Sequence, residues 1–285
     1  MKKTFALMIA VFAMVVAFTS CEKEGQYKPK KKISQIIYTQ SHKVGDLTIS
    51  TKKSEKWTWG GAVLSYIDFY GSDDERTNTL LFRYDDDYRI KELEDSQYSV
   101  EYDYDNGHLD EIEIRDRNTG NLYRKLEFGY KGSKLATIDV TTNNSKASAP
   151  MMFNPLRFML PDDVAEMMMS NAASKGVVHY NITWSGKNIA EIVSDGSERT
   201  YVKWSYDNMI NPLKGFLNTN LGLDESYSAN NAVREEIYAD GKTTIVDYSY
   251  EYNGKYPTKV KYQTESSLLV PGVTLTVDNV ITYQY

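Results

Sequence analysis

Cysteine is almost absent from this 285-residue chain, and histidine is scarce. A single cysteine, Cys21, excludes an internal disulfide. The three histidines, His42, His108 and His179, lie too far apart in sequence for a metal-ligand spacing, and no glycine-rich phosphate loop occurs. We therefore expect no metal site, no cofactor and no thiol chemistry.

Long apolar runs are also lacking, with one exception at 5–18, which is shorter than the roughly 20 residues that a membrane-spanning helix needs. It follows Lys2 and Lys3 and precedes small residues, as in a secretory signal peptide. Phe18-Thr19-Ser20-Cys21 resembles the lipobox of bacterial lipoprotein precursors, with Phe18 in place of the usual leucine. We predict a signal peptide at 1–20 and lipidation, including palmitate, at Cys21. The alternative is an ordinary secretory signal with an incidental cysteine.

Residues 21–35 are charged and polar, which predicts a flexible tether. Its lysines at 28 and 30–32 either are solvated or touch lipid headgroups. A stable anchor needs at least two acyl chains, and the resemblance to lipoproteins implies that several are present. We expect an exported protein that is held by this anchor at the outer membrane, with its periplasmic or surface orientation left open.

Excess basic charge is missing as well. The net charge is −6, and it becomes about −8 without residues 1–20, which hold two lysines and no acidic residue. Nucleic-acid binding requires a basic field, so we expect no nucleic-acid partner.

Alternation with a period of two runs through most of the chain. Tyrosines and aliphatic residues recur at every second position, as at 98–105, 126–130 and 246–252, with polar residues between them. This pattern is typical of antiparallel strands with one apolar face and one wet face. The dipeptides Asn106-Gly107, Asp195-Gly196, Asp240-Gly241 and Asn253-Gly254 favour tight hairpin turns.

An aromatic-x-aromatic strand end followed by a polar turn recurs at 82–85, 102–105, 128–131, 204–207 and 250–253. We interpret it as one hairpin unit used repeatedly. The chain is thus predicted to be all-β, a large antiparallel meander of hairpins that forms a curled sheet or a barrel. One β-rich domain should span 36–285.

The segment 143–176 interrupts the alternation and is rich in methionine. Pro161-Asp162-Asp163 predicts a helix start, and we expect a short helical insertion near 155–175. Either it plugs one end of the sheet or it is a lid that binds a partner through its flexible methionines. The residues of such a partner segment are Met151, Met152, Met167, Met168 and Met169.

The motifs at 206–213, 228–233 and 250–259 follow one another in an order that resembles uncharacterised lipoproteins of gut Bacteroides relatives, a family of unknown function described as porin-like in fold. The resemblance covers about residue 36 to the end. It implies a large antiparallel sheet, curled or closed, on a lipid anchor. It supplies no catalytic residue.

An integral membrane barrel is an alternative, because the chain ends in Tyr285 with Tyr283 before it, and such barrels alternate apolar and polar residues. Charges interrupt several of the aromatic faces, and a lipid anchor would be redundant there. We therefore favour a domain that faces water.

Acidic clusters at 73–75, 85–87 and at Asp103 with Asp105 offer oxygen ligands for calcium or a carboxylate pair for glycoside hydrolysis. Each lies at a predicted turn, where aspartate is a preferred residue. Solvated turns are the favoured interpretation, and we expect no enzyme activity and no catalytic residue.

Aromatic residues on the strand faces are candidates for ligand contact, since exposed rings stack on sugar rings. Packing in the core is the simpler interpretation. The candidate ligand-facing residues are Trp57, Trp59, Tyr102, Tyr104, Tyr250 and Tyr252.

These observations favour a non-enzymatic binding module of the cell envelope that takes a glycan, a lipid or another envelope protein. A structural or assembly lipoprotein that docks an outer-membrane complex through the methionine segment is the second hypothesis, and a hydrolase with an acidic site is the third.

Overall fold

In the part of the chain that the structure describes, 17 strands form a single antiparallel sheet, which curls round until its last strand meets its first. The computed structural model describes residues 31–44, 47–61, 63–143, 154–171, 176–195, 200–213, 228–239, 241–266 and 275–285. The strands are β1 (Gln35–Val44), β2 (Leu47–Gly60), β3 (Val63–Tyr70), β4 (Arg76–Tyr84), β5 (Ile90–Glu94), β6 (Tyr98–Asp105), β7 (His108–Asp116), β8 (Leu122–Lys131), β9 (Lys134–Thr142), β10 (Gly176–Ser185), β11 (Asn188–Asp195), β12 (Tyr201–Tyr206), β13 (Ala232–Ala239), β14 (Lys242–Asp247), β15 (Ser249–Asn253), β16 (Tyr256–Ser266) and β17 (Leu275–Gln284).

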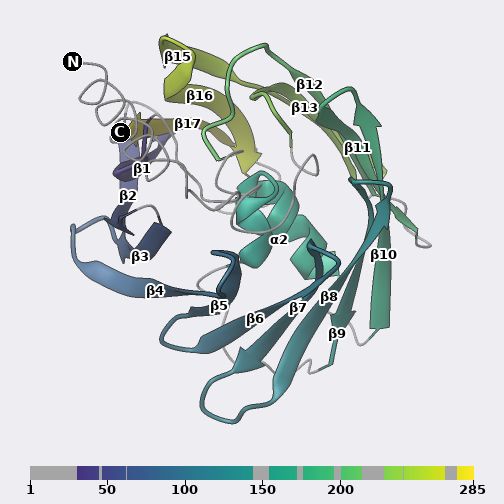
Figure 1. The fold of residues 1–285 in the computed structure, drawn as a ribbon. Helices are drawn as coiled ribbons and strands as arrows, with labels where there is room; N and C mark the ends of the chain where they lie inside the picture. Colours follow the sequence, from purple (N-terminus) through teal and green to yellow (C-terminus); the bar gives the residue numbers. More distant parts are fainter. Residues whose placement is uncertain are drawn as a thin grey trace, which may run out of the picture.

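The closure of the sheet follows from the pairing of neighbours. Strands pair with the next strand along the chain, and β14 continues into β15 through Tyr248, whose amide donates to Val233 of β13 at 2.9 Å. β17 then pairs with β1 from Gln35↔Gln284 to His42↔Val277. The predicted all-β meander of hairpins is confirmed, and Figure 1 shows it as a ring of strands.

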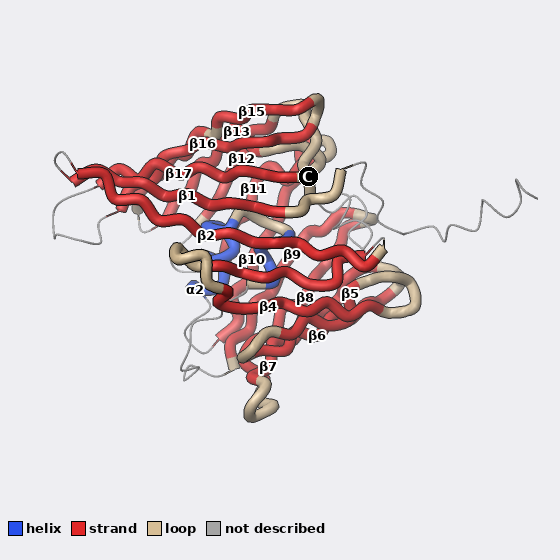
Figure 2. The backbone as a smooth tube through the Cα atoms, turned by 90° about the vertical axis from the view of Figure 1, so that its left-hand side faces the viewer, coloured by secondary structure: helices blue, strands red, loops and turns tan. Residues whose placement is uncertain are grey.

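The predicted helical insertion is also confirmed. It contains a 3₁₀-helix, η1 (Pro155–Phe158), and one α-helix, α2 (Asp162–Asn171). Asn154 caps η1 by accepting from the Leu156 amide at 3.0 Å, and Pro155 stands at its first turn, where proline is favoured. Both helices lie inside the ring (Figures 1 and 2), so this segment is a plug.

The two ends of the ring differ. At one end, which we call the turn end, β1 begins and β17 finishes, and the hairpins are short apart from the connection 207–231 between β12 and β13. Asn106 and Gly107 both have positive φ, as a type I′ turn requires. At the plug end, β9 finishes at Thr142 and β10 begins at Gly176, and the segment between them carries η1 and α2.

Strand alternation places the core inside the ring. From β4 to β10, inward residues such as Leu93, Ile112, Leu126 and Ile138 are fully buried, and α2 covers them with Val164, Ala165, Met168 and Met169. We call this the filled half. The remaining strands, β11–β17 with β1–β3, form the hollow half, because inward residues there line an internal cavity.

Candidate functional site

The aromatic-x-aromatic repeat of the sequence forms a ring of hydrogen bonds at the turn end. In each case the last aromatic side chain at the end of a strand running toward this end donates to a backbone carbonyl within two residues of the start of the preceding strand. The pairs are Trp59 to Ile33 (2.7 Å), Tyr84 to Leu64 (2.7 Å), Tyr104 to Ile90 (2.8 Å), Tyr130 to Leu109 (2.8 Å), Trp184 to Leu135 (2.8 Å) and Tyr285 to Pro257 (2.8 Å).

A register shift immediately before the last aromatic residue accompanies this arrangement. It occurs, for example, between Arg83 and Tyr84 and between Asp103 and Tyr104. A bulge of this kind disrupts the local ladder and redirects a side chain. The aromatic donor then supplies a partner to backbone carbonyls near the strand starts, so the repeat is a device for closing hairpins.

The unit that ends in Tyr206 departs from this rule. Ser228 stands between Tyr206 and β11: its hydroxyl donates to the Tyr206 hydroxyl at 2.9 Å and accepts from the Ile189 amide at 3.0 Å. In the next unit Tyr250 donates to the Ala232 carbonyl at 2.7 Å, and Tyr252 donates to the Asp207 carboxylate. The two departures flank the same long connection, 207–231, and they lie in the hollow half.

A cavity of about 910 Å³ occupies the interior of the hollow half, between the plug and the strands. Aromatic rings and neutral polar groups from β1–β3, β12 and β15–β17 share its wall. The aromatic members are Tyr38, Trp57, Phe69, Tyr70, Phe158, Trp204, Tyr206, Tyr248, Tyr250, Tyr262 and Tyr283, and the neutral polar side chains include Gln40, Thr51, Ser54, Asn154, Asn211, Ser228, Asn230, Asn231, Thr264 and Asn279.

An ion pair between the sheet and the plug lies on the cavity wall. Arg157 of η1 donates through Nη2 to the Oε1 of Glu55 on β2 and to the Tyr38 hydroxyl at 3.0 Å. Trp57 donates through Nε1 to the Oε2 of Glu55 at 3.2 Å. The Glu55 side chain is only 5% exposed and that of Arg157 is 18% exposed, so the pair is largely screened from bulk water.

Toward the plug end the cavity wall carries a chain of hydrogen bonds between uncharged side chains. Gln40 donates to Asn279 at 3.1 Å, and Asn279 donates to Thr264 at 2.9 Å. These residues lie side by side on β1, β17 and β16. The exposed residues Thr51, Lys53 and Thr77 extend the lining beyond them, so the cavity reaches the surface at the plug end.

Residues at the two described edges of the connection 207–231, among them Asn211, Asn230 and Asn231, line the cavity at the turn end. Asp207 accepts from the amides of Met209 and Asn231 at 2.9 and 3.1 Å, and Asn230 and Asn188 exchange hydrogen bonds at 3.1 and 3.2 Å. These contacts tie both described edges of the connection to neighbouring strands.

The six aromatic residues proposed as ligand-facing occupy three kinds of environment. Trp57 and Tyr250 line the cavity. Trp59, Tyr104 and Tyr252 belong to the turn end, where their polar atoms donate to Ile33, Ile90 and Asp207. Tyr102 is buried in the filled half, and no hydrogen-bond partner for its hydroxyl is present among the described residues.

Burial raises the pKa of several tyrosine side chains, at the turn end and in the filled half. The pKa of Tyr84, Tyr102, Tyr104 and Tyr130 lies well above the ordinary tyrosine value, mainly because desolvation disfavours the phenolate. The same cause, with the neighbouring Asp207 carboxylate, raises the pKa of Tyr252. Neutral phenol groups therefore serve as hydrogen-bond donors across the physiological range.

The methionine segment faces the core where it is described. Met168 and Met169 are buried, and the half-buried Met167 packs against the core cluster. Met151 and Met152 lie outside the described residues, as do Cys21 and the segment 1–20. The described methionines thus hold α2 in the filled half.

The acidic clusters 73–75 and 85–87 lie in turns, as predicted. Asp103 and Asp105, for which a turn was also predicted, instead belong to the last residues of strand β6. Asp85 accepts from the amides of Asp87 and Arg89 at 2.9 and 2.8 Å and pairs with the Arg89 guanidinium at 2.8 Å. Asp73 accepts from the Glu75 amide at 3.1 Å. Within the described part of the chain, no group of three or more acidic, histidine or cysteine residues could hold a metal ion.

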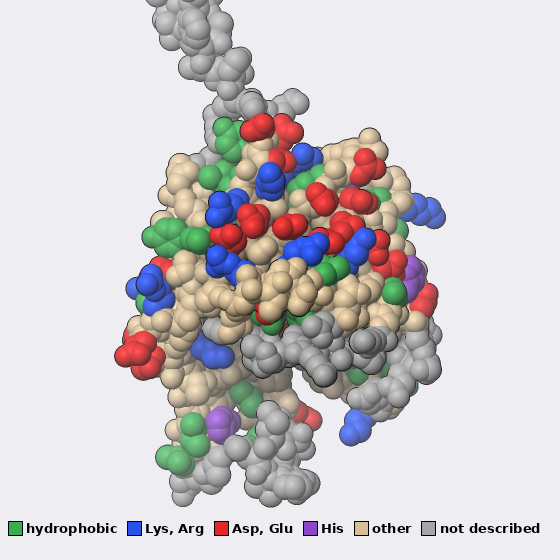
Figure 3. Space-filling model, turned by 90° about the horizontal axis from the view of Figure 1, so that it is seen from below, with side chains coloured by type: hydrophobic (Ala, Val, Ile, Leu, Met, Phe, Trp, Pro, Cys, Tyr) green, Lys and Arg blue, Asp and Glu red, His purple; other side chains and the backbone are tan. Residues whose placement is uncertain are grey.

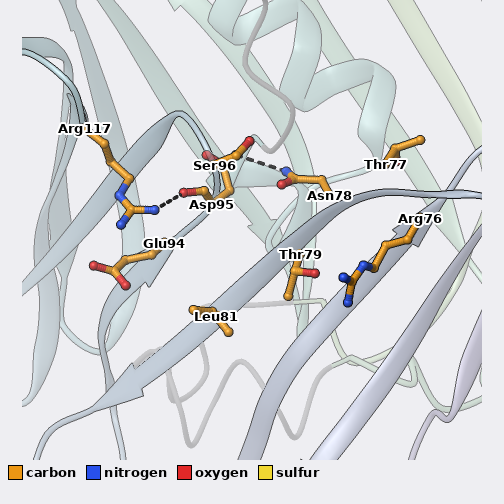
Figure 4. A pocket seen from close by; sticks show the side chains of 9 residues that line it. All are labelled: Arg76, Thr77, Asn78, Thr79, Leu81, Glu94, Asp95, Ser96 and Arg117. Atoms are coloured by element: carbon orange, nitrogen blue, oxygen red, sulfur yellow. Dashed lines mark hydrogen bonds between the residues drawn. The ribbon is translucent and has the colours of Figure 1, made fainter.

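A second hollow, of about 370 Å³, lies beside β4 and the turn after β5 (Figure 4). Its wall is polar apart from Leu81, and Asp95 within it is engaged by the amides of Gln97 and Tyr98, both at 2.7 Å. Asn78 also donates to Asp95 at 3.4 Å. These contacts shape the turn, so the larger cavity is the better ligand site.

Charged pairs cover the outer face of the filled half. Arg83 contacts Glu92 and Glu94 at 3.3 and 2.8 Å, and Lys125 contacts Glu111 and Glu127 at 2.7 and 3.1 Å. Figure 3 shows acidic and basic side chains intermixed across this face. Of the helices in the described residues, none has the length and apolarity required to cross a membrane.

Solved structures of porin-like proteins are similar to this one. A porin-like protein from Bacteroides uniformis superposes with a TM-score of 0.53 at 13% identity, covering 92% of this chain and 99% of its own. A porin-like protein from Bacteroides vulgatus gives 0.45 at 11% identity, covering 89% and 98%. No protein-family model and no curated protein matches the chain. The predicted resemblance to porin-like Bacteroides proteins is thus confirmed in fold.

Proposed function

We propose that this chain is a lipid-anchored binding protein of the cell envelope, which takes a small ligand into the cavity of its hollow half and acts without catalysis. The observation that supports this most is the cavity itself: about 910 Å³ enclosed by a closed sheet and lined by aromatic and polar side chains. Ligand pockets typically measure about 300–1,000 Å³ and combine aromatic walls with a few placed polar groups.

The unequal filling of the ring supports a role for this space. Protein interiors are normally close-packed, with few voids larger than a water molecule. The filled half obeys this rule, since its inward residues are buried against α2. The hollow half keeps partly exposed aromatic residues such as Tyr38, Tyr206 and Tyr283 on its inner wall, which favours selection for a ligand.

The geometry of the ends fits an anchor at Cys21. The described chain enters the sheet at the turn end, and the cavity reaches the surface at the plug end. A tether from Cys21 would place the turn end toward the membrane and the cavity mouth away from it. The charged outer face of the filled half suits an aqueous surface, since Arg or Lys facing lipid at the bilayer midplane costs about 2–4 kcal/mol.

Ligand uptake is testable through the two tryptophans of the cavity wall, Trp57 and Trp204. Native mass spectrometry against panels of oligosaccharides and fatty acids should give one retained class, and the same compound should change the tryptophan fluorescence. Ile281→Trp, which fills the cavity, should abolish retention. Thr282→Trp, on the opposite face of the same strand, should not. Retention that survives Ile281→Trp would place the ligand elsewhere.

The anchor is tested separately. Cys21→Ser should move the protein from the membrane pellet to the soluble envelope fraction and remove metabolic labelling by palmitate. A Cys21→Ser variant that still sediments with membranes after a carbonate wash would overturn the anchor and favour an integral barrel.

A further inference from the structure

We infer that the ligand of the cavity is a neutral oligosaccharide and that Glu55 and Arg157 are the residues that select it. This inference rests on the proposed binding function and assigns its ligand class. It also gives the plug a role in recognition, because Arg157 belongs to η1 whereas Glu55 belongs to β2.

The pair offers the chemistry that a sugar ring requires. A carboxylate accepts hydrogen bonds at two oxygens, and a guanidinium donates from a planar fork. Two neighbouring hydroxyl groups of a sugar ring can each donate and accept a hydrogen bond. One can therefore donate to the carboxylate while the other accepts from the guanidinium beside it. Glu55 and Arg157 are held in place by Trp57 and Tyr38, which hydrogen-bond to them at 3.2 and 3.0 Å, so little ordering is needed on binding.

The lining as a whole distinguishes a saccharide from an acyl chain. The chain Gln40–Asn279–Thr264 and the groups of Ser228 and Asn231 extend the polar surface along the cavity. These groups already bond to one another or to the backbone. A hydrocarbon ligand would displace water from their remaining donor and acceptor positions without replacing its hydrogen bonds, and each buried position left unsatisfied costs about 1–3 kcal/mol. A saccharide carries hydroxyls along its length and avoids this cost.

The charge of the cavity wall and its aromatic rings favour a neutral saccharide over an acidic one. The charged lining residues are Lys53, Glu55, Arg157 and Glu166, two of each sign, so the wall has no net charge to attract an acidic sugar. Aromatic rings on the wall are supplied by Trp57 and by Tyr248 and Tyr262, whose centroids lie 5.0 Å apart. The apolar faces of neutral pyranose rings suit such walls.

The plug positions Arg157 through its own packing. The Asn154 cap and Pro155 fix the start of η1, and the Phe158 ring packs edge-on against Trp57 with 6.3 Å between centroids. Phe158 also lies 5.8 Å from the ring of Phe82 in the filled half. Packing against the filled half therefore positions the Arg157 guanidinium, which lines the cavity of the hollow half.

The test is calorimetric titration of the purified full chain with maltotriose, cellotriose, xylotriose and mannotriose, and with trigalacturonate and palmitate as the charged and lipid probes. At least one neutral trisaccharide should bind. Glu55→Gln and Arg157→Lys should each weaken it at least tenfold, the latter because lysine keeps the charge and loses the planar fork. Glu191→Gln, which removes an outer-face partner of Lys203, is the matched control and should change nothing.

Tyr38→Phe keeps the test decisive if the charge variants fail to fold, since it removes only the hydroxyl that accepts from Arg157; we expect a three- to fivefold loss. Binding of palmitate or trigalacturonate in preference to every neutral trisaccharide would overturn this inference and leave the binding function standing. Unchanged affinity in Tyr38→Phe together with a folded Glu55→Gln or Arg157→Lys variant would overturn the role of the pair. Failure of all six probes and of the wider panels would instead overturn the proposed function.

Discussion

The filled and hollow halves of the ring are built from the same hairpin unit and use it differently. On β5, β7 and β9 the inward positions carry aliphatic residues, such as Leu93, Ile114 and Val140, that are buried in one core cluster with residues of α2. On β1 and β16 the corresponding wall carries Tyr38, Gln40, Tyr262 and Thr264, and the space before them stays open. The repeated unit therefore determines the hairpin geometry in both halves. The type of residue at the inward positions determines whether a hairpin contributes to the packed core or to the cavity wall.

Tyrosine has two structural roles in this molecule. At the turn end tyrosine closes hairpins by donating to backbone carbonyls, as Tyr84 and Tyr130 do. In the cavity it forms a wall, as Tyr248 and Tyr262 do. An excess of tyrosine over phenylalanine, 23 to nine, therefore reflects structure as well as function.

Truncation of an inward aliphatic residue should separate the halves most strongly. Ile112→Ala in the filled half removes a fully buried side chain and should cost about 3–4 kcal/mol of unfolding free energy. Ile281→Ala on the cavity wall, where the space is already open, should cost about 1 kcal/mol. Urea titration followed by circular dichroism measures both, and equal losses would show that the hollow half is packed in solution.

Alkaline pH should weaken the filled half. Burial raises the pKa of Tyr84, Tyr102, Tyr104 and Tyr130, whereas tyrosines of the unfolded chain titrate at about 10. Below that pH both states are protonated and stability is unaffected. Above it the unfolded chain releases protons that the folded chain retains, so stability falls as the pH rises.

Thermal melts from pH 8 to 11.5 measure this effect. The melting temperature should hold to about pH 10 and then fall, and the fall should be shallower in Tyr130→Phe. A melting temperature that stays constant through pH 11.5 would contradict the burial of these phenols.

Two tyrosines of β6 provide a smaller and matched test. Tyr104→Phe removes the hydrogen bond to the Ile90 carbonyl and should cost about 1 kcal/mol. Tyr102→Phe removes a buried hydroxyl for which the described residues offer no partner, so stability should stay level or rise by about 1 kcal/mol. Chemical denaturation measures the unfolding free energy of both variants. A similar loss of stability in both would contradict the distinction between a tyrosine that closes a hairpin, Tyr104, and one that only fills the core, Tyr102.

The outer face should matter least. Lys125→Gln removes contacts to Glu111 and Glu127, but exposed ion pairs contribute little because water and salt screen them. We expect the unfolding midpoint to stay within experimental error, and added salt to leave it there. A clear loss of stability would mean that this face is covered by a partner in the assay.

The hairpin framework could be predicted from sequence because its signals are local. Alternation, Asn106-Gly107 and the aromatic-x-aromatic ends each act within one or two strands. The plug helix was likewise marked by Pro161 and the acidic pair after it. The cavity could not be predicted, because it depends on which strands the plug covers after the ring has closed.

The pair of Glu55 and Arg157 was missed, although each residue carried a signal. Glu55 shares a strand face with Trp57, which places a carboxylate on an inward face. Arg157 is the one charged residue in the run Pro155-Leu156-Arg157-Phe158-Met159-Leu160. Their contact spans 102 positions of sequence, and no local pattern joins the two.

The pairing of β1 with β17 has a consequence for how the molecule is made. Nearly every other ladder joins strands adjacent in the chain, so most of the sheet can form by adding one hairpin to the last, and only the final step joins residues more than 200 positions apart. Until β17 arrives, β1 and β16 are open edges that invite pairing with other chains. The last ten residues of the sheet thus protect the first ten from aggregation.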